Sequence, residues 1–493
     1  MRFSVDHVSS SPARSLEKRA ARRGGTFLWL VRKEVWERRL DHRLAIGVSV
    51  CILLALFSAL TQLHAIRGAR EEESARRSRW LAGIEEQLQR DEDLEVDGFR
   101  SMSPAAVLAN GLEAVLPVRF TSTKDGLHWG EGRGALNLGA ALFGTFDLTF
   151  VVGTLFSLLT VLLTYDSVCG ERSLGTLALL LSYPVSRSSV LLAKVVASAV
   201  LICSGLTVAF LVVLLSAVFS GIPLINLTNW LGFWCLASAT LTAWAALGVA
   251  VSVHVRRPPT AALVGLLLWV VGVFLVPRTV GMVVDQLNPP RRLIELSLQE
   301  DEEVSRLRSH YRRELETAFA AFVRGSASDN DRHADLDRAR KQAQDKLDRS
   351  RRQVQERLWA ETERFERERD VTTTIISLLS PEALFRQSAA ELSWTGYSQR
   401  HHFYSSVRQY HQQIGSRLAE SRQEFFLASS GGRGQAMIWH AAIDSLLIPF
   451  TTTWASGREV FDEVLLPAAA LALYGPLFFA IGMWGFRRLE IRS

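Results

Sequence analysis

The sequence predicts an all-α polytopic membrane protein with six transmembrane helices, an amphipathic elbow helix before the first, and a large, mostly helical extracytoplasmic domain with a long antiparallel hairpin. Three observations predict this class. Of the 493 residues, 48% are hydrophobic and 22% charged, so apolar and polar segments must be segregated along the chain. Six apolar segments approach the length of about 20 residues that crosses a bilayer as a helix. Basic residues gather beside these segments, as in membrane proteins.

The N-terminal segment, residues 1–43, is polar and ends in the elbow helix. Between residues 27 and 43, apolar side chains share one helical face and basic side chains occupy the other positions. A helix of this kind prefers the plane of the membrane interface, in contact with lipid. A basic anchor that serves only to orient the first span is the alternative. The residues of the elbow are Phe27, Val31, Arg32, Lys33, Val35 and Trp36.

The six spans follow from the distribution of charge along the chain. No acidic or basic residue lies between Lys194 and His254, which is too long a run for one crossing, and Gly221-Ile222-Pro223 supplies a turn that divides it. A seventh apolar stretch, residues 436–453, contains His440, Asp444 and Pro449 and is therefore interpreted as re-entrant or interfacial. The expected spans are residues 44–66, 141–165, 190–220, 230–253, 259–276 and 464–486.

Orientation follows from the short connections. Lys and Arg concentrate in the N-terminal segment, in residues 166–189, around Arg256 and Arg257, and in the tail 487–493, whereas the turn Gly221–Thr228 is uncharged. By the positive-inside rule both termini are cytoplasmic, which predicts a multi-pass protein of the cell inner membrane. The insertions 67–140 and 277–463 then lie outside. Neither insertion contains cysteine, so neither has a disulfide framework.

The larger insertion carries the hairpin. Apolar residues recur at helical spacing over residues 296–323 and again over 331–370, so the two segments are expected to pair as antiparallel helices. At about 1.5 Å per residue the longer helix would extend roughly 55 to 60 Å. Downstream, Ser380 and Pro381 are typical of a helix cap and first turn.

A polar insert between the second and third spans is the most distinctive motif. It runs from Tyr165 through Asp166 and Gly-Glu-Arg to Tyr183-Pro184-Val185-Ser186-Arg187. This string resembles the cytoplasmic loop of ABC-2 type transporter permeases. Arg32-Lys33-Glu34 is similar to the entry segment of that family, and residues 379–410 resemble a subgroup with a large helical outer domain between the fifth and sixth spans. The matching loop residues are Asp166, Gly170, Glu171, Arg172, Gly175, Thr176, Leu177, Pro184 and Arg187.

The resemblance implies that this loop is a coupling helix that docks on a separate ABC ATPase subunit. Glu171 and Arg172 would contact that partner, Leu177, Leu180 and Leu181 would anchor the helix base, and Gly170 and Gly175 would allow close approach. The implied permease works as a dimer with a second copy or with a sister permease. An envelope protein is a possible partner of its outer domain. ATP and Mg would be used by the partner, and this chain itself would bind no cofactor.

Other chemistry finds no support in the sequence. No Gly-x-x-x-x-Gly-Lys-Ser/Thr string occurs, so we expect no enzymatic activity in this chain alone. His401, His402 and His411 lack the spacing of a metal site, and no basic and aromatic groove indicates nucleic acid. Asp147, near the outer end of the second span, is a carboxylate within the membrane and so a candidate functional residue; an interfacial, hydrated or helix-capping role is favoured over that one. The leading interpretation is an ATP-driven export permease, with force transmission to the outer domain as a variant and a membrane-anchored sensor or scaffold as the alternative.

Overall fold

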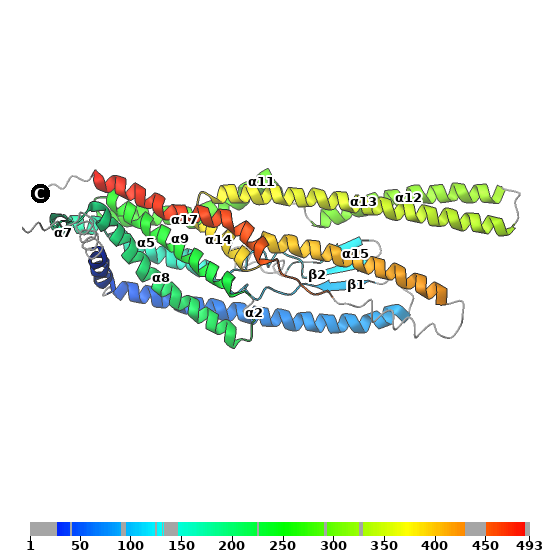
Figure 1. The fold of residues 1–493 in the computed structure, drawn as a ribbon, viewed down its shortest axis with the longest axis horizontal. Helices are drawn as coiled ribbons and strands as arrows, with labels where there is room; N and C mark the ends of the chain where they lie inside the picture. Colours follow the sequence, from blue (N-terminus) through cyan, green and yellow to red (C-terminus); the bar gives the residue numbers. More distant parts are fainter. Residues whose placement is uncertain are drawn as a thin grey trace, which may run out of the picture.

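The computed structural model describes residues 27–39, 42–89, 95–123, 126–130, 132, 146–223, 226–289, 293–324, 329–428 and 450–488. These residues form an elongated, mostly helical molecule (Figure 1). Loop 166–189, the helix over residues 27–39 and the last described residues, up to 488, lie at one end, which we call the loop end. The hairpin lies at the opposite end, in what we call the outer part.

The six apolar helices expected from the sequence are present, so the all-α polytopic membrane class is confirmed. Two of them contain a π-helical segment. The six spans, in chain order and separated here by semicolons, consist of these elements: α2 (His42–Gln89); α4 (Leu148–Phe150), η1 (Val151–Phe156) and α5 (Ser157–Thr164); α8 (Arg187–Phe219); α9 (Leu227–His254); α10 (Pro258–Val270), η2 (Val271–Leu275) and α11 (Val276–Leu287); and α17 (Gly457–Arg487).

Helix α9 lies at the centre of the bundle. It packs against α5, α8 and α17, and its Trp230 and Trp244 are fully buried. Gly248 permits the close approach of α5, because a Cβ atom there would lie 1.9 Å from Thr164 Oγ1. At the far end of the second span, Asp147 caps α4 by accepting a hydrogen bond from the Phe150 amide at 2.8 Å. The capping interpretation of Asp147 is therefore confirmed, whereas the hydrated state is not, because the residue is buried and its second oxygen accepts from the Asn110 amide at 2.9 Å.

The smaller insertion contains a sheet that was not predicted from the sequence. Strands β1 (Val96–Phe99), β2 (Arg119–Thr123) and β3 (Gly126–Trp129) form an antiparallel sheet in the order β1-β2-β3. Phe120 of β2 is buried against Phe403, Tyr410 and Phe450 from the C-terminal half of the chain. The two insertions therefore share one aromatic core in the outer part.

The hairpin is formed by α12 (Leu293–Arg324) and α13 (Asp329–Ser377), which pack side by side as expected. Val304 and Leu358 are buried between them, and the Tyr311 hydroxyl lies 3.1 Å from Ser350 Oγ. Helix α13 has 49 residues, so at about 1.5 Å per residue it extends about 73 Å, further than the sequence suggested.

The next helix, α14 (Pro381–Leu392), returns to the bundle, and α15 (Tyr397–Ala428) runs outward again from the first turns of α17. Ser380 caps α14 as expected, accepting from the Glu382 amide at 3.1 Å while donating to the Gly272 carbonyl at 2.6 Å. Although this segment was expected within the outer domain, α14 packs directly against α9, α17 and both π-helical segments. Most of segment 436–453, expected to be re-entrant or interfacial, lies outside the described residues.

Candidate coupling site

Loop 166–189 folds into two short helices, α6 (Cys169–Ser173) and α7 (Thr176–Ser182). Gly175 joins them as the N-cap of α7 with φ +74°, a left-handed conformation that glycine adopts without strain. No atom outside its neighbours lies within 4 Å of a Cβ placed at Gly175, and at Gly170 such an atom makes only an ordinary contact with Asp166. Within this chain, Gly175 is therefore required by backbone conformation rather than by close packing.

The leucines of the loop divide into a buried and an exposed set. Leu177 and Leu180 are buried and Leu181 is half-buried, so the expected anchoring is confirmed. Leu174, Leu179 and Tyr183 are 79%, 68% and 62% exposed, and Pro184 is exposed beside them. We call these four residues the loop surface. Large apolar side chains held in solvent on a firmly packed base are typical of a protein-binding surface.

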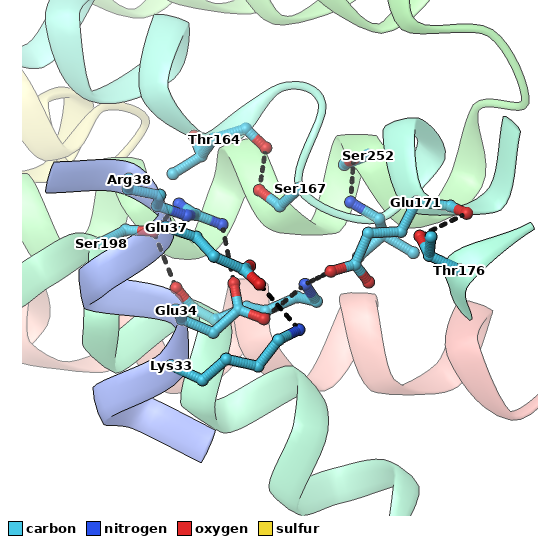
Figure 2. Close-up of polar contacts among 12 residues, drawn as sticks. Lys33, Glu34, Glu37, Arg38, Thr164, Ser167, Glu171, Thr176, Ser198 and Ser252 are labelled. Carbon is cyan, nitrogen blue, oxygen red and sulfur yellow. Dashed lines mark hydrogen bonds and ion pairs between the residues drawn. The ribbon is translucent and has the colours of Figure 1, made fainter. Parts of the chain in front are cut away.

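An ionic network lies behind the loop (Figure 2). The Lys194 ammonium of α8 lies 2.7 Å from Glu171 Oε1 and 2.9 Å from Glu34 Oε1. Arg38 lies 3.6 Å from the second oxygen of Glu34 and donates to the Leu163 carbonyl at 3.3 Å. This network joins three segments: the helix over residues 27–39, the start of α8, and α6. We call it the Lys194 network.

The charges at the centre of the Lys194 network are buried, so they must be satisfied by one another rather than by water. Lys194 is 1% exposed and Glu34 4% exposed, so neither charge can be satisfied by water. Burial raises the pKa of Glu34, but attraction to Lys194 and then Arg38 outweighs it, and the pKa is lowered overall. The carboxylates of Glu34, Glu37 and Glu171 approach within 4.8 Å of one another. Lys194 and Lys33 supply the positive charge that such a cluster needs.

Two further contacts fix the loop to the bundle. The Ser252 hydroxyl of α9 accepts hydrogen bonds from the amides of Val168 and Cys169 at 2.9 and 3.1 Å. Arg187 Nη1 donates to the carbonyls of Phe486 and Arg487 at 3.2 and 3.1 Å, which places a cation at the C-terminal end of α17. The loop therefore contacts α8, α9 and α17 as well as the elbow.

The remaining predicted residues are placed as follows. Asp166 is exposed, and its carbonyl accepts from the Gly170 amide at 2.8 Å. Thr176 donates to the Glu171 carbonyl at 3.2 Å. Arg172 is partly exposed and forms no ion pair with the described part of the chain. Of the two charges expected to face a partner, only Arg172 is thus left available, because Glu171 is bound to Lys194.

The elbow helix, residues 27–39, packs one face on the loop. Leu30 is buried against Leu180 and Val190, and Phe27 and Val31 are half-buried beside it. Val35 and Lys33 are half-buried, while Arg32 and Trp36 are exposed. The packing roles of Leu30, Glu34 and Arg38 were not predicted, although their i, i+4 spacing marks one stripe of the helix. The role of Lys194 was not predicted either, although its position at the start of an uncharged run was a visible signal.

A bundle of six apolar helices with a polar loop packed against one end defines a polytopic membrane protein. Comparison with known proteins agrees: the model of the ABC-2 family transporter proteins matches residues 28–488. The chain belongs to this family. It is also 34% identical over 153 residues to the "Probable ABC transporter permease protein NosY" of Stutzerimonas stutzeri. That match covers 27% of this chain and 52% of the relative, so the chain spans about half the length of the curated relative it matches.

Proposed function

We propose that this permease receives force from a separate ABC ATPase subunit at the loop surface and transmits it through the spans to the outer part. The loop surface carries the proposal, because its exposed apolar side chains stand on a base held by Leu177 and Leu180 and by the Lys194 network. A mobile loop would absorb a push from a partner, whereas a braced loop passes it on. ATP and Mg belong to the partner in this scheme.

The proposed path has three branches. Through Lys194 the loop moves α8 and the elbow, through Ser252 it moves α9, and through Arg187 it moves α17. Closure of two ATPase subunits would draw together the loops of two permease copies, or of this chain and a sister permease. Helices α2 and α17 extend beyond their apolar segments toward the outer part, so motion of the spans reaches that part directly.

This continuity favours force transmission to the outer part, where an envelope partner would receive it. Export of a substrate through the rearranged spans is the second output, and it uses the same input. A sensor or scaffold that works without an ATPase would not need an exposed apolar loop surface on a firmly packed base. We therefore rank this function after force transmission and after substrate export.

Substitution of Leu179 by Asp tests the docking surface. Leu179 is exposed, so Leu179→Asp leaves the fold unchanged, and loss of an apolar contact worth about 1.5 to 3 kcal/mol should weaken assembly by about tenfold or more. The measurement is co-purification with the ATPase and its stimulation in proteoliposomes. Leu298→Asp, at a similarly exposed leucine of α12, is the matched control. If Leu179→Asp assembles with the ATPase as well as the wild type does, the loop surface is not the docking surface.

Orientation in the inner membrane, with both termini cytoplasmic, is part of the proposal and is tested separately. Cys169 is fully buried and unsuitable as a reporter, so single cysteines are placed at the exposed Ser182 of α7 and Ser309 of α12. In a Cys235→Ser background, an impermeant thiol reagent should label Ser309→Cys in intact cells and Ser182→Cys only after permeabilisation. The reverse pattern would overturn the assignment of the loop to the cytoplasm.

A further inference from the structure

A groove with a volume of about 810 Å³ lies in the outer part, where α13 and α15 meet the first turns of α17. Figure 1 shows α15 running outward from the first turns of α17. The groove has the size of a pocket for a small organic molecule. It lies at the far end of the bundle from the loop surface, and the proposed coupling path does not use it.

The groove carries an excess of negative charge. Three arginines, Arg367, Arg400 and Arg408, face a larger set of carboxylates. Those carboxylates are Glu363, Glu366, Asp370, Glu459, Asp462 and Glu463. A ligand that enters the groove therefore meets a field that favours a cation.

Two carboxylate oxygens in the groove lack hydrogen-bond partners. Arg400 binds Glu366 Oε1, but Glu366 Oε2 and Asp370 Oδ1 are buried without a partner among the described residues. Buried acceptors are normally satisfied, so each such oxygen calls for an explanation. A bound group with several N–H donors and a positive charge would satisfy both.

The charged groups around Asp370 support the same conclusion. Burial, followed by repulsion from Glu366, raises the pKa of Asp370 to about 8, despite attraction to Arg400. Glu391 of α14 and Glu463 of α17 add negative charge, and Tyr397 of α15 lies nearby. A cation bound here would lower this pKa by stabilising the ionised carboxylate.

The rest of the groove is apolar. Trp359 and Tyr404 form one wall, with ring centroids 6.3 Å apart. Ile375 and Leu466 line the groove and are 60% and 64% exposed, at the height where α17 begins its apolar segment. An aromatic wall also attracts a cation over its ring faces. These features favour a ligand with an apolar body over a bare ion.

A metal ion fits less well. In the described ranges, the carboxylates that approach closely enough to share an ion are those of Glu34, Glu37 and Glu171 at the loop end, not those of this groove. The groove offers separated single oxygens and aromatic rings, which is the recognition chemistry of an organic ammonium group.

We propose that this groove binds an organic ammonium ion with an apolar body, placing the ammonium group at Asp370 and Glu366 and the apolar body against Trp359 and Tyr404. Binding at this site does not require the ATPase, so it is tested on the permease alone. Failure of this proposal and failure of the coupling proposal are therefore distinguishable.

The test uses the full chain in lipid nanodiscs and dansylcadaverine, a primary ammonium attached to an apolar fluorophore. Fluorescence anisotropy should report saturable binding, and the N-acetylated, uncharged analogue should not bind. Asp370→Asn should weaken binding by about tenfold or more, because it removes one of the two charges that face the ammonium. Glu368→Gln, two residues away on α13 and exposed, should bind as the wild type does.

Equal affinity of the acetylated analogue, or wild-type affinity of Asp370→Asn, would overturn the proposal. If Asp370→Asn does not elute as a folded protein, His401→Lys decides the question. His401 lines the groove with an exposed side chain, so a lysine there adds a competing ammonium without disturbing the core. Weaker binding by His401→Lys supports the site, and unchanged binding contradicts it.

Discussion

Lys194 shows how one buried charge can organise a functional region. Its ammonium lies between carboxylates from two segments that are 160 and 23 residues away in sequence. The sequence reveals a lone charge at the start of an apolar run, but not which acids approach it. Desolvating the three groups costs free energy, and their attraction offsets that cost only while all three are present. The elbow and α6 are therefore held in one defined arrangement.

Removing the cation should be costly. Lys194→Met leaves Glu34 buried beside Glu171, and breaking a buried pair in this way typically destabilises by about 3 to 5 kcal/mol. Thermal unfolding in detergent should show a clear loss of stability, and ATPase stimulation should fall with it. Lys33→Met, which breaks the surface pair with Glu37, should cost about 0.5 kcal/mol or less.

A double-mutant cycle measures the interaction free energy between Glu171 and Lys194 separately from the other effects of each substitution. Glu171→Gln in the Lys194→Met background should cost much less than Glu171→Gln alone, because the two side chains interact directly. Additive effects of the two substitutions would mean that the contact contributes no coupling free energy.

At the scale of elements, the two π-helical segments both face the start of α14. Gly153 of η1 lies under the Glu382 carboxylate, and the Gly272 carbonyl of η2 accepts from Ser380. A π-helical segment, which contains one extra residue in a helical turn, is often found at functional positions. Here each segment turns its backbone toward the start of α14. The sequence predicted the cap at Ser380 and Pro381, yet could not place α14 against the spans, because that placement depends on distant contacts.

Gly153→Ala should disturb this junction. A Cβ atom at residue 153 would lie 1.8 Å from Glu382 Oε1, and overpacking of this kind typically costs about 1 to 3 kcal/mol. Thermal unfolding measures the loss. Gly281→Ala in α11, with no atom within 4 Å, is the matched control and should be neutral or slightly stabilising. Equal stability of the two variants would show that η1 and α14 are not tightly packed.

At the scale of the whole molecule, local patterns and distant contacts contributed differently to what the sequence could predict. Hydropathy predicted the six spans and helical periodicity predicted the hairpin, because both depend on neighbouring residues. The sheet was missed because its stability comes from Phe120 packing on Phe403 and Phe450, hundreds of residues away. The resemblance of loop 166–189 to that of ABC-2 permeases could be read from its residues, but the ion pair between Glu171 and Lys194 could be seen only in the fold.

The outer part should lose stability as pH rises from 6.5 to 8. Asp370, with its pKa raised to about 8, favours the folded state while protonated, so its contribution is lost as pH rises through that value. The pKa of His411 is lowered to about 4 in the folded state, so the unfolded state binds a proton first. His411 therefore affects stability only at pH values below about 6.5 and does not contribute to the change between pH 6.5 and 8. The expected loss is of order 1 kcal/mol.

Hydrogen exchange in residues 397–412, corrected for the intrinsic rate at each pH, measures this change. The Asp370→Asn variant should show a flatter profile between pH 6.5 and 8, because it removes the titrating group. If the variant and the wild type have the same slope, another group is responsible.

Helix α2 has one further consequence. Its 48 residues run without a break from the elbow to the outer part, so at about 1.5 Å per residue it behaves as a single rod about 72 Å long. A tilt of about 5° at the loop end would displace the opposite tip of such a rod by about 6 Å. If the proposed coupling holds, α2 amplifies motion: a small tilt imposed at the loop end becomes a displacement at the far tip that paired spin labels can resolve.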